Sequence, residues 1–160
     1  MVVGVRDDGG LDVTVEELVE RLSDEVRVVI FHGDNRFAAG ILDEIKRFMD
    51  GQKTWNNIRH VNLGLLPSSS SAWENACNMV DKRFGGWVHV HENVDVQDID
   101  KKRDEIVVEL GKLWRDSQGD RIPVEHAVAE CRHVEEVKTY APGVMHCVFD
   151  IELLSPGIES

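Results

Sequence analysis

Apolar side chains recur at helical spacing in four parts of the chain. Near the N-terminus the stripe is Val15, Leu18, Val19 and Leu22, at i, i+3, i+4 and i+7. Thr14 and Glu17 have the spacing of a capping box, so we expect this helix to begin there. Further stripes predict helices from Ile41 to Met49, ended by Gly51, from Ser71 to about Lys82, and from Ile99 to Trp114.

Between these stripes lie shorter apolar runs rich in β-branched residues, which are typical of buried strands. Strands are predicted over 26–31, 59–66, 86–91, 127–138 and 144–154. The last two have no helix between them, and the stretch 140–143 carries the Pro-Gly pair of a turn.

The order of these elements predicts an α/β fold. Alternation of strand and helix favours parallel strands joined by helical crossovers, and the closing hairpin adds an antiparallel strand. We therefore expect a three-layer mixed sheet over 13–155, after an irregular N-terminus at 1–12 and before a C-terminal tail at 156–160.

Polar clusters follow three of the predicted strands. They are Asp34-Asn35-Arg36, Asn62 with Pro67-Ser68-Ser69, and Glu92-Asn93. Because an open α/β sheet binds ligands at the carboxyl ends of its strands, this spacing predicts a site there without naming its ligand. The serine run also begins a predicted helix, since Ser71 and Glu74 have capping-box spacing.

Composition limits the function classes. The chain has 160 residues, 42% of them hydrophobic and 30% charged, as in an ordinary globular domain. No apolar run approaches the ~18 residues of a membrane span, and the start lacks the pattern of a signal peptide. The three cysteines form no C-x-x-C pair and predict buried or idle thiols in a reducing compartment, and we expect the protein to be cytoplasmic. A net charge of -12 is unfavourable for phosphate contacts, so attraction to a nucleic acid must largely come from elsewhere.

Individual residues leave alternatives open. Asp34 is compatible with binding an adenine or ribose, but in Gly-Asp-Asn it is more simply a turn residue. Asn62 lies within an apolar strand and needs partners, which are either backbone groups or a substrate. His89 and His91 point to one face of a strand and are half of a possible metal site with Glu92, His126, His133 or His146. Trp87 shares that face, which instead favours hydrogen-bonded rings packed under a helix, and we expect no metal.

Other catalytic signatures are missing from the sequence. It has no G-x-S-x-G elbow and no Walker loop.

On the last hairpin, Arg132 and Lys138 are candidates for phosphate contacts or a solvated edge. Tyr140, the only tyrosine, is suited either to stack on a base or to brace the turn at Pro142.

Three long motifs resemble one family. They are Asn62-Leu63-Gly64-Leu65-Leu66-Pro67-Ser68-Ser69, the run from Gly85 to Val94, and the run from Val134 to Val144. In this order and at these separations they resemble the tRNA wybutosine-synthesising aminocarboxypropyltransferases, which use S-adenosylmethionine. Gly33-Asp34-Asn35-Arg36 also fits, and the resemblance extends from about Leu22 to Leu154.

The resemblance implies a Rossmann-like class I methyltransferase fold. It also implies transfer of the 3-amino-3-carboxypropyl group from S-adenosylmethionine to the wyosine-type base beside the anticodon of phenylalanine tRNA. Asp34, Asn35, Asn62 and Leu63 would bind the cofactor, and Asn62, Pro67 and Ser68 would line the reacting centre. His91 or Glu92 would orient the substrate or accept its proton, and Lys138, Tyr140 and Pro142 would contact the substrate.

Two departures qualify this reading. A related branch methylates guanine and usually has Asn-Leu-Pro or Asn-Pro-Pro after the strand, whereas Asn62-Leu63-Gly64-Leu65-Leu66-Pro67 favours the aminocarboxypropyl branch. The family also has two strands and a Gly-rich cofactor loop upstream of Leu22, which are missing here. Without them, the strand at 26–31 is cut off from that at 59–66; either the sheet closes differently, another chain fills the gap, or the sequence is a fragment or the product of a truncated gene. We therefore expect this chain alone to bind S-adenosylmethionine weakly or not at all; a non-catalytic, partner-binding remnant is the alternative to an enzyme.

Overall fold

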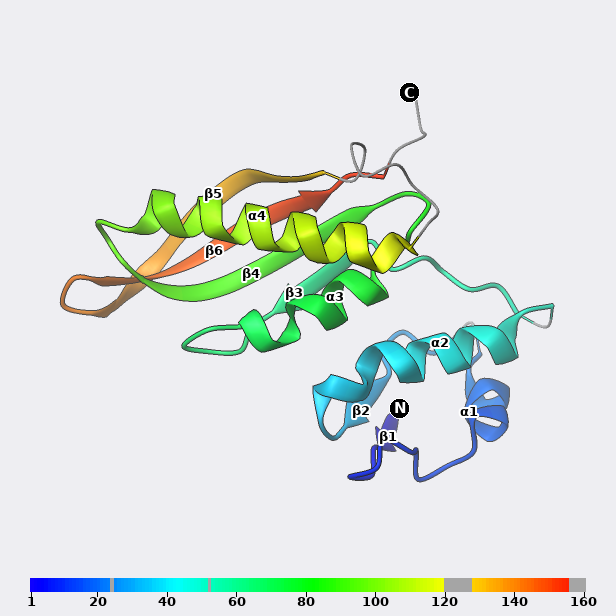
Figure 1. The fold of residues 1–160 in the computed structure, drawn as a ribbon. Helices are drawn as coiled ribbons and strands as arrows, with labels where there is room; N and C mark the ends of the chain where they lie inside the picture. The colour runs from blue at the N-terminus through cyan, green and yellow to red at the C-terminus, as the bar shows by residue number, and fades with distance from the viewer. Residues whose placement is uncertain (24, 52, 120–127, 156–160) are drawn as a thin grey trace. The chain divides into compact units, whose positions relative to one another are not determined.

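The chain folds into two compact units in a computed structural model that describes residues 1–23, 25–51, 53–119 and 128–155. One unit spans Met1–Asn56 and the other Asn57–Ser160 (Figure 1). The sequence had predicted one domain over 13–155. The two units have separate hydrophobic cores, so each is described by itself.

The N-terminal unit combines two helices with a short parallel sheet. Its elements are β1 (Val2–Gly4), α1 (Val15–Arg21), β2 (Ile30–His32), the 3₁₀ turn η1 (Asn35–Phe37) and α2 (Ala38–Met49). The predicted capping box is confirmed, because the Thr14 hydroxyl accepts from the Glu17 amide at 3.1 Å and the Glu17 carboxylate accepts from the Thr14 amide at 3.2 Å. The apolar stripes of α1 and α2 meet in one core around Leu18, Ile41 and Ile45.

Two predictions differ from the structure of this unit. The segment 1–12 contains strand β1, which pairs in parallel with β2. The buried strand predicted over 26–31 is wrong, since β2 begins only at Ile30, whose side chain is 53% exposed. The physical reason is that β1 has only three residues that pair with β2. The apolar residues before Ile30 therefore have no neighbouring strand with which to form a ladder of main-chain hydrogen bonds.

The C-terminal unit is built on a four-stranded mixed sheet in the order β3-β4-β6-β5. The strands are β3 (His60–Leu63), β4 (Gly86–Asp95), β5 (Ala129–Ala141) and β6 (Val144–Leu153). β3 and β4 are parallel, whereas β6 is antiparallel to both β4 and β5. The predicted α/β fold with a mixed sheet and a closing hairpin is confirmed, and β2 and β3 lie in separate sheets as expected.

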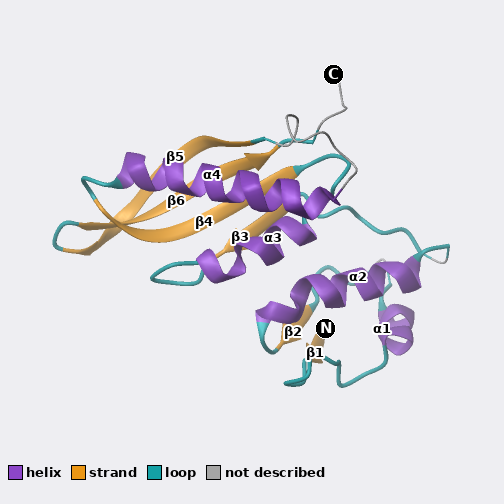
Figure 2. Ribbon diagram, in the orientation of Figure 1, coloured by secondary structure: helices purple, strands orange, loops and turns teal. Residues whose placement is uncertain are grey.

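Two helices cover one face of this sheet, α3 (Trp73–Met79) and α4 (Ile99–Gln118), as Figure 2 shows. Alternate residues of β4 and β6 face them, so Val88, Val90, Phe149 and Ile151 are fully buried against the helices. Trp114 of α4 is also fully buried, and its indole N–H donates to the Leu154 carbonyl at 2.8 Å. Among the described residues, no helix is both long enough and apolar enough to cross a membrane.

Two element boundaries in this unit correct the sequence prediction. The helix predicted from Ser71 has no cap at that residue, because a 3₁₀ turn, η2 (Ser70–Ala72), precedes α3 and Ala72 is its N-cap. Strand β4 does not end at Glu92-Asn93 but continues to Asp95, because β6 pairs with it along its whole length. Glu92 and Asn93 are therefore mid-strand residues that point to opposite faces.

Gly85 provides a direct test of this packing, because its φ is +64° and a Cβ there would lie 2.1 Å from the Leu153 carbonyl oxygen. Gly143 is a matched control, with φ of +76° and no atom of the described residues within 4 Å of the point that a Cβ would occupy. We expect Gly143→Ala to lower the free energy of unfolding by about 1–2 kcal/mol through its left-handed backbone alone. Gly85→Ala adds a backbone clash and should cost about 3–4 kcal/mol. Urea denaturation measures both, and equal losses would contradict the proposed close approach.

Candidate functional site

The loop after β3 is held to β4 by the carboxylate of Glu92. One oxygen, Oε1, accepts from the Ser68 hydroxyl at 3.1 Å, the Ser69 amide at 2.9 Å and the Ser69 hydroxyl at 3.2 Å. The main chain adds a bond from the Asn93 amide to the Pro67 carbonyl at 3.1 Å. The loop that follows the strand therefore has a defined position next to β4.

Burial makes this anchor strong. Ser69 is fully buried and Glu92 is 4% exposed, and the Trp73 indole donates to the Ser69 hydroxyl at 3.0 Å. Hydrogen bonds to a charged acceptor are stronger than neutral ones, and they are costly to lose where water cannot replace them. Glu92 was a candidate catalytic residue on sequence grounds, and here its oxygen is occupied by the serine loop.

The opposite face of the sheet carries a group of polar and aromatic side chains, half of them histidines, here called the histidine face. Its members come from β3, β4 and β6 and are His60, Asn62, Trp87, His89, His91, Asn93, His146 and Asp150. Both α3 and α4 pack on the other side of the sheet (Figure 2). The predicted shared face and hydrogen-bonded rings of His89 and His91 are confirmed, whereas the predicted cover by a helix is not provided by these two helices.

One chain of contacts on this face joins Asn62 to Asn93 through two histidines. His91 Nε2 lies 2.9 Å from Asn62 Oδ1, and His91 Nδ1 lies 3.3 Å from His146 Nε2. His146 Nδ1 in turn lies 3.1 Å from Asn93 Oδ1. Asn62 is exposed while His146 is buried, so the chain leads from the surface into the sheet.

A second chain runs beside it. His89 Nδ1 lies 2.6 Å from Asp150 Oδ1, and His89 Nε2 lies 3.1 Å from His60 Nδ1. The rings of His60 and His89 are stacked with centroids 5.4 Å apart, and His60 also stacks on Trp87 at 6.4 Å. The carboxylate and the stacked rings give the histidine face a fixed arrangement.

The electrostatic environment keeps His91 neutral. Burial lowers the pKa of its imidazole from the ordinary value, and the neighbouring His146 and His89 lower it further, while Asp150 acts in the opposite direction. A neutral imidazole has one nitrogen free to accept a proton. Within the described ranges, no group of three or more His, Cys, Asp or Glu residues is placed to hold a metal ion.

The predicted cofactor residues are divided between the two units. Asp34 caps η1, where its Oδ1 accepts from the Arg36 amide at 2.9 Å and its Oδ2 lies 3.4 Å from Arg36 Nε, and Asn35 is the first residue of that turn. This matches the turn-forming alternative for Asp34. Asn62 lies on β3 beside His91, but the neighbouring Leu63 side chain is buried in the core.

The predicted substrate residues lie at the free end of the hairpin. Tyr140 is 61% exposed on β5, and Pro142 is in the turn that follows. Lys138 is exposed and is the register partner of His146, so it lies next to the histidine face. The structure thus places Lys138 next to His146, whereas Asn62 and the Pro67-Ser68 loop belong to the opposite edge of the sheet, and Tyr140 and Pro142 are further along the hairpin.

Sequence reasoning missed the roles of Asn93, His146 and Asp150. His146 and Asp150 alternate with the buried Cys147, Phe149 and Ile151, which is the signal of a strand with two different faces. Their pairing with β4 depends on the hairpin register, and that register is set only when the strands meet.

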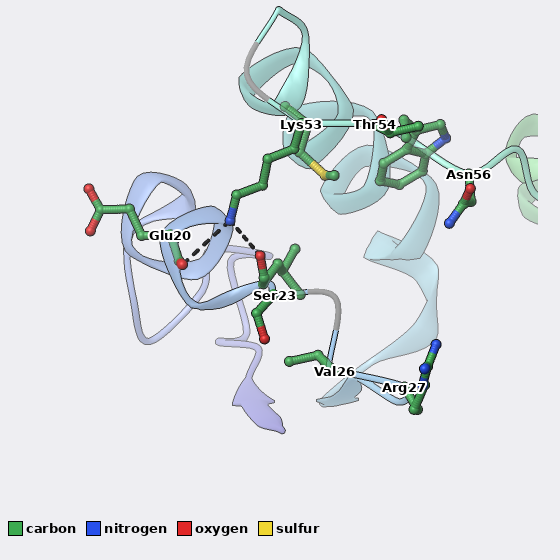
Figure 3. A pocket seen from close by; sticks show the side chains of 10 residues that line it. Glu20, Ser23, Val26, Arg27, Lys53, Thr54 and Asn56 are labelled. Atoms are coloured by element: carbon green, nitrogen blue, oxygen red, sulfur yellow. Dashed lines mark hydrogen bonds between the residues drawn. The ribbon is translucent and has the colours of Figure 1, made fainter.

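A separate pocket in the N-terminal unit has a volume of about 940 Å³ and includes Glu20, Arg27, Lys53 and Trp55 in its lining (Figure 3). None of the predicted site residues lines it. Its lysine is already engaged, because the Lys53 ammonium donates to the carbonyls of Val19, Glu20 and Leu22 at the end of α1. Such contacts satisfy the last carbonyls of a helix, so Lys53 serves the fold.

These features define an α/β unit with a candidate site at the serine loop and the histidine face. No profile of a known protein family matches the chain. The tRNA wybutosine-synthesizing protein 2 of Schizosaccharomyces pombe is 32% identical over 126 residues, which cover 79% of this chain and 25% of that protein. An Arabidopsis thaliana tRNA wybutosine-synthesizing protein 2/3/4 is 32% identical over 136 residues, covering 83% of this chain and 11% of that protein.

The chain is therefore related to the tRNA wybutosine-synthesizing proteins, and the resemblance noted in its motifs is confirmed. It spans about a quarter of the Schizosaccharomyces pombe protein. Among solved structures, M. jannaschii TYW2 in complex with AdoMet has a TM-score of 0.46 at 18% identity, covering 81% of this chain and 58% of that one. P. horikoshii TYW2 in complex with MeSAdo has a TM-score of 0.47 at 16% identity, covering 79% and 48%.

The Glu92 anchor can be tested by Glu92→Leu, which leaves the buried Ser69 amide and hydroxyl without their acceptor. We expect a loss of about 3 kcal/mol in the free energy of unfolding and faster amide hydrogen exchange at Ser69. Glu92→Gln keeps an acceptor oxygen and should lose about half as much.

Glu135→Gln, at an exposed carboxylate on β5, is the surface control and should change stability by less than about 0.5 kcal/mol. A Glu92→Leu protein with unchanged exchange at Ser69 would show that the carboxylate does not hold the loop.

Proposed function

We propose that this chain is part of a tRNA-modifying transferase. The reaction moves the 3-amino-3-carboxypropyl group of S-adenosylmethionine onto the wyosine-type base beside the anticodon of phenylalanine tRNA. The observation that carries the proposal is the sequence relationship to the wybutosine-synthesizing proteins over most of this chain. The contact of Asn62 with His91, the residue before Glu92 in β4, is compatible with it.

The residues of the chain would act mainly by positioning. The Pro67-Ser68 segment would form one wall of the reacting centre, and Glu92 would hold that wall in place. Asn62 would present its exposed amide to the reactants from the end of β3. Fixing groups in a reactive arrangement lowers a barrier without any covalent enzyme intermediate, so few reactive side chains are needed.

His91 is the group in this site suited to accept the proton that the base releases. Its lowered pKa keeps the imidazole neutral at physiological pH, and a neutral imidazole is a competent proton acceptor. Glu92 is less suited to this role, because three donors share its Oε1 and its side chain faces the helices. We therefore assign proton transfer to His91 and loop positioning to Glu92.

S-adenosylmethionine would supply an electrophilic carbon next to its sulfonium. The exposed Asn62 amide fits a polar ligand of this kind, whereas Leu63 would contribute its main chain only, since its side chain is buried. Asp34 and Asn35 would bind at the adenosine end in the family arrangement. In η1 the Asp34 carboxylate is engaged with Arg36, so binding there would require it to exchange this local partner.

The tRNA would be contacted by the free end of the hairpin. Lys138 offers a positive charge next to the histidine face, and the exposed ring of Tyr140, with Pro142 after it, offers a stacking surface. With a net charge of -12, this chain would need further basic surface from the rest of a longer protein or a partner. A cytoplasmic tRNA enzyme is also compatible with three unpaired cysteines.

The proposal predicts that deletion of the gene removes wybutosine from phenylalanine tRNA and that the intact gene restores it. Complementation with the Asn62→Ala gene should restore no more than about one tenth of the wybutosine that the intact gene restores. Loss of a positioning contact raises the activation free energy by about 1.4 kcal/mol or more. Mass spectrometry of the tRNA nucleosides measures the product.

Asn78→Ala is the matched control, because Asn78 is an exposed asparagine on α3, on the other side of the sheet. It should restore wybutosine fully. Unchanged wybutosine after deletion would overturn the proposed function.

A further inference from the structure

Three exposed apolar side chains lie at the end of the sheet where the serine loop begins. Leu65 and Leu66 follow β3 and are 51% and 42% exposed, and Val96 follows β4 and is 46% exposed. Because β3 and β4 are parallel, both loops leave the same end of the sheet, where the turn of the β5–β6 hairpin also lies (Figure 1). Single exposed apolar residues are common, whereas several at one candidate site indicate a contact surface. These three residues are here called the apolar rim.

The loop that carries the two leucines is fixed at both ends. Leu63 is paired within β3 and its side chain is buried. Ser68 donates its hydroxyl to Glu92 Oε1 at 3.1 Å. Only four residues separate these two fixed points, so Leu65 and Leu66 are held outside the core. A contact surface that is already in place loses little conformational freedom when a ligand binds.

The other end of the rim is fixed to the hairpin. The Val96 amide donates to the Gly143 carbonyl at 3.0 Å. The neighbouring Asp95 carboxylate accepts from the Gln97 amide at 2.9 Å. A carboxylate at this place repels a phosphate group, so the rim is better suited to an uncharged apolar ligand than to the backbone of a nucleic acid.

The register of the loop on β4 gives the length of the rim. The Asn93 amide donates to the Pro67 carbonyl at 3.1 Å, so the loop lies beside Asn93. Val96 is three residues further along the chain, which is about 10 Å at the rise of a strand. This length is comparable with that of a fused ring system.

The substrate of the proposed function has matching chemistry. A wyosine-type base is a guanine whose Watson–Crick edge is closed by a third, methylated ring. That edge therefore lacks the hydrogen-bond donors by which guanine is normally recognised. What distinguishes the tricyclic base from guanine is its additional apolar surface, and only an apolar contact gains free energy from covering it.

We propose that Leu65, Leu66 and Val96 bind the third ring of the wyosine-type base and thereby select this base over unmodified guanine. The inference rests on the proposed function for the identity of the substrate. The serine loop follows the leucines directly, so a base held by the rim lies next to the Pro67-Ser68 wall of the reacting centre.

The test is a titration of the full chain, with ¹³C-labelled Leu and Val methyl groups, with two synthetic RNA hairpins. Both have the sequence of the anticodon arm of phenylalanine tRNA, and one carries the wyosine-type base where the other carries guanine. The first hairpin should shift the methyl signals of Leu65, Leu66 and Val96. It should also bind at least about tenfold more tightly than the second, which is the smallest effect typical of one added apolar group.

Variants of the two leucines separate apolar contact from other effects. The double variant Leu65→Ser, Leu66→Ser should bind the tricyclic hairpin about tenfold more weakly and the guanine hairpin unchanged. The double variant Leu65→Met, Leu66→Met keeps the apolar surface and should keep the preference. Val108→Ser, at a side chain that is 70% exposed on α4, is the control and should change neither affinity. If the double serine variant does not fold, Leu65→Ser alone provides the same comparison.

Equal affinity for the two hairpins, binding of neither, or methyl shifts confined to other residues would overturn the proposal. So would a chain that sediments as a dimer when intact and as a monomer in the double serine variant, since the leucines would then contact a second copy. The titration involves no transfer reaction. Selective binding at the rim with unchanged wybutosine after gene deletion would count against the proposed function alone. Loss of wybutosine without selective binding would count against this inference alone.

Discussion

The carboxylate of Glu92 is the contact on which the candidate site depends. It is buried in the middle of β4 and accepts three hydrogen bonds from Ser68 and Ser69, which follow β3 after the break at Pro67. A buried carboxylate is stable only where donors offset its desolvation, and buried donors are stable only where an acceptor meets them. The serine loop and the strand therefore stabilise each other, and these hydrogen bonds fix the position of the loop.

Strand β4 separates two kinds of environment by its alternation. Val88, Val90, Glu92 and Val94 face the helices, whereas Trp87, His89, His91 and Asn93 face the other way. The first set builds the core and holds the loop, and the second builds the histidine face. Because one strand carries both, the residues proposed to position the substrate are attached directly to the best-packed part of the unit.

Prediction succeeded where a local pattern was sufficient. The capping box at Thr14, the stripe of α4 and the closing hairpin each depend on a few neighbouring residues, and all are found in the structure. It failed where a distant partner decides. The apolar run before Ile30 forms no strand because β1 is short, and β4 extends beyond Glu92 because β6 continues to pair with it.

For the candidate site, the sequence by itself determined which residues are unusual for their context. A lone Asn in an apolar strand, four serines after a proline, and a His-x-His-Glu-Asn run were all visible, as was their resemblance to a tRNA-modifying family. Only the tertiary structure decided their partners: Glu92 meets the serines, and His91 meets Asn62 and His146. The physical reason is that side-chain period gives the face on which a residue lies, whereas strand register, set by long-range pairing, gives the neighbour it meets.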